Sequence, residues 1–356
     1  MATLNDVARE AGVSPITVSR VINNSPSVRP ETREKVMVAV KKLHYQPNLL
    51  ARSLSADRMD SIGVIVTRVE NPMYSLMTSG IYSEAAEYGF DVILSCSHDL
   101  ESTIKSVTTL LNKRVSGIIL LPVEFRVEKP GAGDAGSSND LKMMKEFSEQ
   151  FGGIMNQYAP ANFPVVTFGG QIKEGVSGRV IENYGGGAVM AVDYLAKRGH
   201  KNIGFISHID KTEGIWGDRY RGFLQGMEKN GLNVVKNWIV YSDENVDSAK
   251  AAMDRILAQE QRPTAVYCAN DIIAVGALNA MADSGMSVPG DISVIGHDGS
   301  SFGEMVRPSL TTVAIYPVEM GRRAVRLLLS VMRGESGADL ILTPQVIERK
   351  SVSGPA

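Results

Sequence analysis

The sequence predicts a multidomain α+β protein: a small all-helical N-terminal domain followed by an α/β body of two similar lobes. Residues 3–43 hold three short amphipathic helical segments with capping residues at their starts. Downstream, short apolar strands alternate with helical stretches in two successive cycles, over 62–121 and 202–296. Such alternation is typical of parallel sheets flanked by helices, and its recurrence predicts two related lobes with a cleft between them.

Length and composition narrow the class of protein. With 356 residues the chain is long enough for two or three domains, and its 44% hydrophobic and 21% charged residues are ordinary for a globular protein. No apolar run approaches the roughly 20 residues of a membrane span, and the N-terminus has no apolar signal core. Cys96 and Cys268 form no CxxC pair and suit a reducing compartment. We therefore expect a cytoplasmic protein without membrane contact.

The first two helical segments are joined by a tight turn. Thr3 can cap the first helix, and Asp6 three residues later completes a capping box. Gly12 permits the backbone bend, Ser14 can cap the second helix, and Pro15 suits its first turn. The apolar face of the first helix consists of Leu4, Val7, Ala8 and Ala11. Two short capped helices at this spacing therefore follow from the local sequence.

The second helix carries its polar residues on one side. Val18, Val21 and Ile22 fall on the inner face, and the outer positions are Ile16, Thr17, Ser19, Arg20 and Asn23. Thr, Ser, Arg and Asn are side chains that reach base edges and phosphates, although a merely solvated face fits some of them almost as well. The pattern favours a helix-turn-helix whose second helix enters a DNA major groove.

A third helix and a possible hinge follow. Residues 30–43 form an amphipathic segment, Pro47 interrupts the chain, and Asn48 can cap a brief helix over 49–55. Residues 1–60 carry nine Lys and Arg against six Asp and Glu, a net charge of +3, which leaves −5 for the remainder. A basic head on an acidic body suits phosphate contact at one end, although the margin is small.

Taken together, these segments resemble the LacI/GalR family of ligand-controlled repressors. The resemblance rests on LNDVAREAGVSPITVSRVIN, HYQPN and ARSL, and further on SIGVIV, RGHKNIGFI, RYRGF, PTAVYCANDIIAVGAL, VPGDISVIGHD and PSLTTV. It implies a helix-turn-helix head (1–46), a hinge (47–60) and a two-lobed ligand-binding and dimerisation body (61–356). The lobes would be Rossmann-like, as in periplasmic binding proteins. A homodimer would bind a palindromic DNA operator under the control of a small-molecule effector.

The resemblance also assigns DNA contacts. Pro15, Ile16 and Arg20 match positions that vary with the operator, and Thr17 and Ser19 match phosphate contacts. In the hinge, a leucine wedges into the minor groove while two short helices pair across the dimer. The full set of expected DNA-binding residues is Thr3, Ser14, Pro15, Ile16, Thr17, Ser19, Arg20, Asn23, Asn48 and Leu54. Leu54 buried against the body is the alternative to the wedge.

The effector contacts implied by the resemblance lie in both halves of the body; they are Met73, Tyr74, Arg219, Glu244, Asn270 and Asp298. Asn270 and Asp298 could instead cap helices, and Arg219 could pair with a neighbouring acid. Several positions depart from the family: Gly169 replaces an aspartate, Glu244 an aromatic residue, His297 an aromatic residue and Gly299 an acid or amide. These changes suggest a polar ligand, a sugar or sugar derivative first and a nucleoside next.

Motifs for catalysis or metal binding are not evident. The five histidines form no HxxxH or HExxH pattern, and GxSxG and GxxxxGK[ST] do not occur. The run 185–187 of three glycines is interpreted as close backbone packing at a helix start. We expect a repressor rather than an enzyme, with no cofactor or metal. A cytoplasmic sugar-binding module or sugar-processing enzyme is the alternative.

One stretch, 125–162, is longer than the family resemblance suggests. It contains KPGAGDAGSSND, which is rich in Gly, Ser and Asp and predicts a mobile loop, followed by a short helix over 141–151. This stretch is either a tolerated surface insertion, which we prefer, or a cover for the ligand cleft.

Overall fold

The computed structural model describes residues 2–22, 25–45, 60–67, 69, 71–122, 136–170, 172–208 and 214–355, with the backbone alone at 136–144 and 214–216. The chain divides into two compact units, Met1–Met59 and Asp60–Ala356. We call the first unit the head and the second the body, and each is described by itself. Within these residues no helix combines the length and apolar character needed to cross a membrane.

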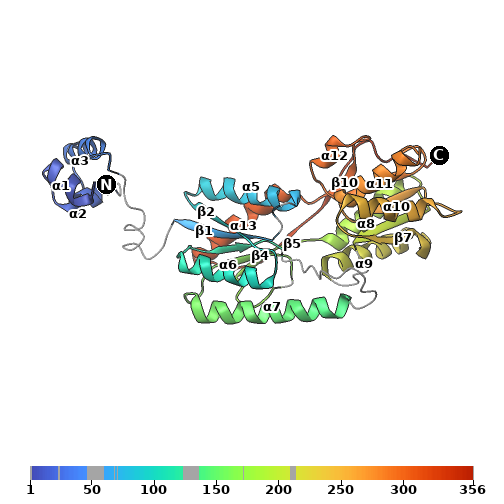
Figure 1. The fold of residues 1–356 in the computed structure, drawn as a ribbon, viewed down its shortest axis with the longest axis horizontal. Helices are drawn as coiled ribbons and strands as arrows, with labels where there is room; N and C mark the ends of the chain where they lie inside the picture. Colours follow the sequence, from blue (N-terminus) through green and yellow to red (C-terminus); the bar gives the residue numbers. More distant parts are fainter. Residues whose placement is uncertain are drawn as a thin grey trace. The chain divides into compact units, whose positions relative to one another are not determined.

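The head is a bundle of three helices, α1 (Leu4–Ala11), α2 (Pro15–Ile22) and α3 (Pro30–Lys42) (Figure 1). Each helix contributes two buried residues to one small core, which contains Val7, Ala8, Val18, Val21, Val36 and Ala39. Because these side chains are short, the helices approach closely, and the rest of each helix surface remains available for other contacts.

Local capping defines the ends of these helices as the sequence predicts. The Thr3 side chain accepts a hydrogen bond from the Asp6 backbone N–H (3.3 Å), and the Asp6 carboxylate accepts one from the Thr3 N–H (2.9 Å). Gly12 ends α1 at φ 66°, a left-handed conformation that favours glycine. Ser14 Oγ accepts from the Thr17 N–H (3.2 Å) at the start of α2. The predicted capping box, turn and second cap are therefore confirmed.

The first lobe of the body, lobe A, is built on a six-stranded parallel sheet. Its strand order is β11 (Asp339–Leu342), β5 (Gly178–Glu182), β4 (Val165–Phe168), β3 (Ile118–Leu120), β1 (Ser61–Val66) and β2 (Asp91–Cys96). One face is covered by α5 (Pro72–Glu87) and α13 (Pro317–Met332), and the other by α6 (Leu100–Asn112) and α7 (Gly136–Tyr158) (Figure 1). Both faces are therefore buried, as in other parallel sheets.

Lobe B repeats this plan. Its sheet has the order β12 (Gln345–Ile347), β10 (Thr311–Ala314), β9 (Ser293–Asp298), β8 (Ala265–Cys268), β6 (Ile203–His208) and β7 (Ile239–Ser242), with β12 antiparallel to β10 and the other pairs parallel. Two helix pairs cover it, α8 (Tyr184–Lys197) with α9 (Gly214–Lys229) and α10 (Val246–Leu257) with α11 (Asp271–Asp283). The short elements η1 (Lys236–Trp238) and α12 (Phe302–Met305) complete it. Two similar lobes are thus confirmed.

The chain passes between the lobes three times: from β5 to α8, from β10 to α13, and from β11 to β12. Neither lobe is therefore a continuous stretch of sequence. Residue Glu182 ends β5 in lobe A, and Tyr184 begins α8 in lobe B. This first crossing places residues of the two lobes directly beside each other.

Burial explains the sequence of the central strands. All six residues of β1, SIGVIV, are buried because helices cover both faces, so its sequence is a continuous small or apolar run. At the edge of the same sheet, β2 contains only half-buried and exposed positions. The cycles predicted over 62–121 and 202–296 correspond to these elements with shifts of a few residues at their ends.

The insertion differs from the sequence prediction. A helix expected over 141–151 is instead the 23-residue α7, which begins at Gly136 and therefore includes part of the predicted loop. Phe147, Phe151 and Met155 recur at helical spacing and are buried against lobe A, which extends the helix beyond its predicted end. The tested part of the loop prediction, 136–140, is wrong, and residues 123–135 lie outside the described residues.

Helices α5 and α13 cross at two glycines. A Cβ on Gly80 would meet the Val318 carbonyl oxygen well inside van der Waals contact, and one on Gly321 would meet the Met77 carbonyl oxygen in the same way. Gly80→Ala should therefore lower the free energy of unfolding by about 1–3 kcal/mol, because backbone rather than a flexible side chain must move. Urea denaturation followed by circular dichroism measures this change.

Gly153→Ala in α7 is the matched control for that substitution. A Cβ at Gly153 has no neighbour within 4 Å, so the better helix propensity of alanine should stabilise the protein, by up to about 1 kcal/mol. If both variants shift stability in the same direction, the close crossing of α5 and α13 does not decide the effect.

Candidate functional site

The exposed face of α2 is the candidate DNA interface in the head. Val18 and Val21 anchor α2 in the core, and this leaves Ile16 66% exposed and Arg20 exposed on the outside. Thr17 and Ser19 are half-buried beside them. The neighbours of Ile16 on this face are hydrogen-bonding side chains. The face thus combines an apolar contact, a guanidinium and hydroxyls.

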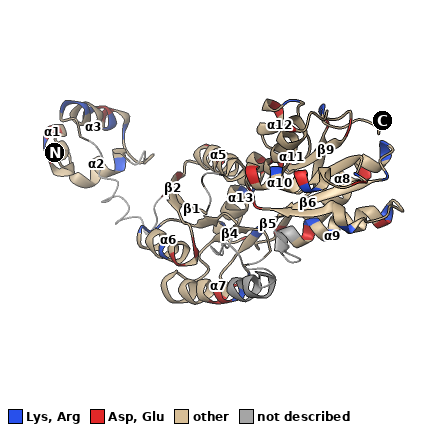
Figure 2. Cartoon of the chain, turned by 45° about the vertical axis from the view of Figure 1, so that its right-hand side comes forward, with Lys and Arg blue, Asp and Glu red and all other residues tan. Residues whose placement is uncertain are grey.

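The other residues predicted to bind DNA fall into two groups. Thr3, Ser14 and Pro15 are exposed at the starts of α1 and α2, where the two hydroxyl groups also act as caps. Predictions for Asn23, Asn48 and Leu54 fall outside the described residues. In Figure 2, Lys and Arg occur on all three helices of the head. One of them, Arg33 on α3, donates hydrogen bonds to the carbonyl oxygens of Val21 (3.2 Å) and Ser25 (2.8 Å).

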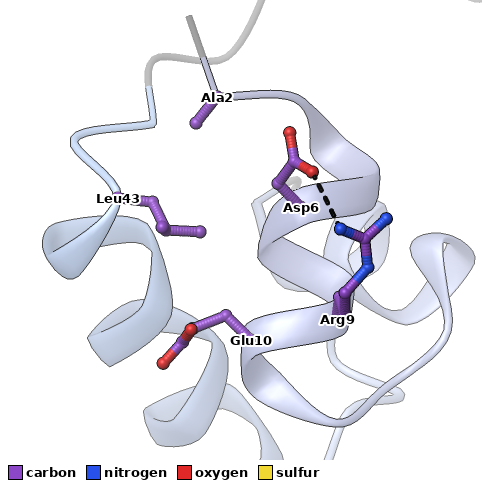
Figure 3. Close-up of a pocket in the computed structure, with 5 residues that line it drawn as sticks. All are labelled: Ala2, Asp6, Arg9, Glu10 and Leu43. Atoms are coloured by element: carbon purple, nitrogen blue, oxygen red, sulfur yellow. Dashed lines mark ion pairs between the residues drawn. The ribbon is translucent and has the colours of Figure 1, made fainter.

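A shallow pocket of about 370 Å³ lies between α1 and α3 (Figure 3). Figure 3 shows Leu43 and Ala2 on one side and the ion pair between Asp6 and Arg9 (3.5 Å) on the other, with Glu10 below. Two carboxylates make this lining unsuited to a phosphate group, and none of the predicted DNA contacts lines it. We therefore assign the pocket to the packing of α1 on α3.

In the body, polar side chains gather around Arg219 of α9. Arg219 is 2% exposed, its Nη2 lies 2.9 Å from Asp298 Oδ1, and its Cζ lies 4.1 Å from the centre of the Tyr184 ring. A buried guanidinium with a carboxylate and an aromatic face is held in a fixed orientation. The alternative that Arg219 pairs with an acid is therefore confirmed, and its partner is another predicted effector residue.

Asp298 ends β9 in a strained conformation. Its φ is 102°, which is rare for a residue with a Cβ and is found mainly where function requires it. Burial raises its pKa well above the usual range, although the Arg219 guanidinium acts in the opposite direction. The following loop is fixed by Asp271, which accepts hydrogen bonds from the Ser300 N–H (2.6 Å) and the Thr312 hydroxyl (2.6 Å). Asp298 caps no helix among the described residues, because Ser301 precedes α12.

Asn270 has two roles in the structure. Its Oδ1 accepts a hydrogen bond from the Ile273 N–H (2.8 Å) and so caps α11, as the alternative interpretation expected. Its Nδ2 donates to Glu244 Oε1 (2.7 Å), which brings these two predicted effector residues together. Glu244 also contributes to the raised pKa of Asp298. The two pairs therefore belong to one electrostatic neighbourhood.

Three residues beside Arg219 were not among the predicted contacts. Tyr267 Oη and His297 Nδ1 lie 2.7 Å apart, and His297 Nε2 lies 3.3 Å from Glu182 Oε1. All three side chains are buried. Together with Tyr184, Arg219 and Asp298, these residues are called the polar cluster below. Glu182 could have been noticed as an acid at the end of an apolar strand, whereas Tyr267 looks like any core residue of PTAVYCAND.

The remaining predicted residues lie elsewhere or act through the backbone. Met73 and Tyr74 are buried in the hydrophobic core of lobe A. Gly169 has φ 78°, so a residue with a Cβ would be strained there. A Cβ on Gly187 would lie 2.6 Å from His297 Cε1, and one on Gly222 would overlap the Gly185 carbonyl oxygen. The glycine run therefore serves close packing, as predicted. No group of three metal-ligating side chains converges within the described ranges.

Comparisons with known proteins agree on both parts of the chain. Residues 3–48 match the family described as bacterial regulatory proteins, lacI family, and residues 192–352 match the periplasmic binding protein-like domain. The HTH-type transcriptional repressor PurR of Pectobacterium carotovorum subsp. carotovorum (strain PC1) is 35% identical over 360 residues, covering 100% of this chain and 98% of that protein. PurR of Serratia proteamaculans (strain 568) is also 35% identical, with the same coverage.

Solved structures show the same similarity. The lac repressor dimer bound to operator and the anti-inducer ONPF has a TM-score of 0.80 at 27% identity, covering 99% of each chain. The transcriptional regulator CelR–cellobiose complex has a TM-score of 0.66 at 27% identity, covering 99% of this chain and 100% of that chain. Since the similarity spans head and body alike, the chain belongs to the lacI family of bacterial regulatory proteins, and it is a transcriptional regulator with a DNA-binding head and an effector-binding body.

Proposed function

We propose that this protein is a cytoplasmic repressor that binds a palindromic operator as a homodimer and is controlled by a sugar or sugar derivative at the polar cluster. The observation that carries the proposal is the outer face of α2, where Ile16 and Arg20 are exposed while Val18 and Val21 hold the helix in the core. An anchored helix of this size fits a DNA major groove.

The chemistry of α2 supports readout of bases. Ile16 offers an apolar surface for a thymine methyl group, and Arg20 can donate two hydrogen bonds to guanine O6 and N7. Thr17 and Ser19 offer hydroxyl groups for phosphate oxygens, which position the helix without selecting sequence. Thr3 and Ser14 would supply further contacts from the helix starts, together with Asn23.

A dimer explains how such a small head selects one site. Two heads related by twofold symmetry read half-sites about one helical turn apart, so the operator would be a palindrome. The lac repressor structure to which this chain is similar is itself a dimer bound to operator. In this proposal Asn48 caps the hinge helix, and Leu54 enters the minor groove, where an apolar wedge kinks the duplex.

The polar cluster and its neighbours suit a hydroxyl-rich ligand. Asp298 and Glu244 can accept hydrogen bonds from vicinal hydroxyls, while Arg219 and Asn270 can donate them. The CelR structure at 27% identity contains cellobiose, a sugar. Met73 and Tyr74 would add apolar surface from lobe A if the lobes close on the ligand. The protein would bind this effector without converting it, so mass spectrometry should recover the ligand unchanged.

Replacing Arg20 tests direct readout of the operator. Arg20→Ala should weaken operator binding by about 1–3 kcal/mol and relax the base preference at one position in each half-site. Binding to operators that carry each of the four bases at that position measures both effects. Arg9→Ala is the control, because Arg9 is an exposed arginine of α1 that is not among the predicted DNA contacts. Equal losses on operator and random DNA would mean that Arg20 contacts only phosphate.

The proposal as a whole is tested in two stages. Selection from random duplexes should recover a palindrome, and its binding should weaken steeply as salt rises because several phosphates are contacted. A thermal-shift screen of sugars, sugar derivatives and nucleosides should then identify an effector that changes operator affinity. Salt-insensitive binding without any palindrome would contradict the repressor, and a stabilising nucleoside would replace the sugar as the effector class.

A further inference from the structure

The polar cluster is closed into a ring by one hydrogen bond between the lobes. Starting at Glu182, the backbone leads to Tyr184, whose ring lies under the Arg219 guanidinium, and Arg219 pairs with Asp298. The backbone leads from Asp298 to its neighbour His297, whose Nε2 lies 3.3 Å from Glu182 Oε1. Tyr184 and Asp298 both contact Arg219. Tyr184 follows Glu182 closely in the chain and Asp298 follows His297, so the hydrogen bond between Glu182 and His297 links the two contacts.

The ring joins elements of both lobes. Glu182 ends β5 of lobe A, whereas His297 lies on β9 and Tyr267 on β8 of lobe B. Tyr267 extends the connection, since its hydroxyl lies 2.7 Å from His297 Nδ1. His297 and Tyr267 are completely buried, so water cannot take the place of these contacts. The buried polar groups of these side chains must therefore find their hydrogen-bond partners within the protein.

We propose that the chain Glu182–His297–Tyr267 positions the Arg219–Asp298 pair for the effector, and that one proton on Glu182 decides in which direction its hydrogen bonds run. This inference rests on the proposed function of the polar cluster. When Glu182 is ionised, His297 Nε2–H donates to the carboxylate, and the Tyr267 hydroxyl donates to Nδ1. When Glu182 is protonated, its O–H donates to Nε2, and Nδ1–H donates to Tyr267.

The electrostatic surroundings allow this change near neutral pH. Burial raises the pKa of Glu182 to about 8, against the opposing effects of Arg219 and Tyr184. Burial, together with the charge of Arg219, lowers the pKa of His297 well below its usual range, so the imidazole stays neutral. Burial also raises the pKa of Tyr267, which therefore keeps its proton. Of the three members of the chain, Glu182 is thus the one that titrates. Asp298, whose pKa burial also raises, and Cys268 face the chain from β9 and β8.

Histidine tautomers can be observed directly in the full-length protein. With histidine labelled by nitrogen-15, the His297 signal is assigned by its loss in His297→Gln. We expect Nδ1–H below the pKa of Glu182 and Nε2–H above it, whereas Glu182→Gln should hold one tautomer throughout. A His297 tautomer that stays the same from about two units below that pKa to about one unit above it would overturn the proposal. This measurement needs neither effector nor operator, so it can fail while the proposed function stands.

The positioning role has its own test, in which the hydrogen-bonding groups are kept. A Cβ on Gly187 would lie 2.6 Å from His297 Cε1, so Gly187→Ala should displace the imidazole. Gly185→Ala on the same helix is the control, because its Cβ would meet only the Asp218 carbonyl oxygen at 3.4 Å. Effector affinity, measured by titration calorimetry with a hit from the screen, should fall about tenfold in Gly187→Ala, as when other supporting contacts are lost. Gly185→Ala should leave it unchanged, and equal affinities for the two variants would contradict the positioning role.

Discussion

Arg219→Ala should abolish the response to effector and lower the free energy of unfolding by about 3–5 kcal/mol. Arg219 is 2% exposed, and removing its guanidinium leaves Asp298 and Glu182 in a buried site without the cation that faces both of them. Without the cation, the two buried carboxyl groups must either take up protons or be reached by water, and both outcomes lower the stability of the fold. Urea denaturation measures the loss, and operator release by the effector measures the response.

Two further variants separate the causes of that loss. Arg221 is on the same helix with its side chain 57% exposed, so Arg221→Ala should change stability by less than about 1 kcal/mol. Adding Asp298→Asn to Arg219→Ala removes the buried acid, and asparagine tolerates the positive φ of this position. The double variant should recover part of the stability. If it recovers none, lost packing on Tyr184 rather than charge explains the effect.

Glu182→Gln is expected to flatten the dependence of stability on pH. Because burial raises the pKa of Glu182 from 4.5 to about 8, the folded protein holds a proton that the unfolded chain releases between these values. Stability is therefore full below 4.5 and falls as pH rises towards 8, by roughly 5 kcal/mol in total from this one group. The glutamine variant lacks the ionisable group and should lose this slope.

Thermal unfolding across the same pH range compares the two proteins. Asp271, whose pKa burial raises to about 6, contributes a slope of the same sign to both proteins. Glu182 is one of the groups that raise the pKa of Asp298, so the difference between the curves reports Glu182 together with its effect on Asp298. Glu87→Gln provides the same substitution at an exposed position near the end of α5 and should reproduce the wild-type curve. Parallel curves for the wild type and Glu182→Gln would mean that Glu182 is ionised in the folded protein at neutral pH.

The parts of the fold that depend on local sequence could be predicted. Capping by Thr3 and Ser14, the bend at Gly12, and the apolar spacing of Val18 and Val21 act within a few residues of each other. The buried strands could also be recognised, because a strand covered on both faces, such as β1, is a continuous small or apolar run. The recurrence of strand–helix cycles over 62–121 and 202–296 predicted two lobes, and the family resemblance implied the same arrangement.

Features that depend on tertiary contacts were harder to predict. The full length of α7 was missed because the glycines and serines around Gly136 favour loops locally, while the buried face of Phe147, Phe151 and Met155 stabilises a helix through its packing on lobe A. Propensity is a weak guide when an apolar face can be buried in this way. The same limit applies to the close crossing at Gly80 and Gly321.

The candidate site was predicted in part, and the reason is topological. Arg219, Asp298, Asn270 and Glu244 carry polar groups in recognisable motifs, and the structure brings them together. Glu182 and Tyr267 come from strands of different lobes, and nothing in their local sequence shows that His297 lies between them. The contact between Glu182 and His297 forms where the chain crosses from β5 to α8.

The three crossings between the lobes also govern when the body can form during synthesis on the ribosome. Helix α13 and strand β11 belong to lobe A and β12 to lobe B, yet all three come after residue 316. The head can fold as soon as it emerges, because domains fold as units from the N-terminus. Translation that stops before residue 317 would leave lobe A without α13, which covers one apolar face of its sheet, and lobe B without its edge strand. Such a truncated chain would be readily degraded by cellular proteases.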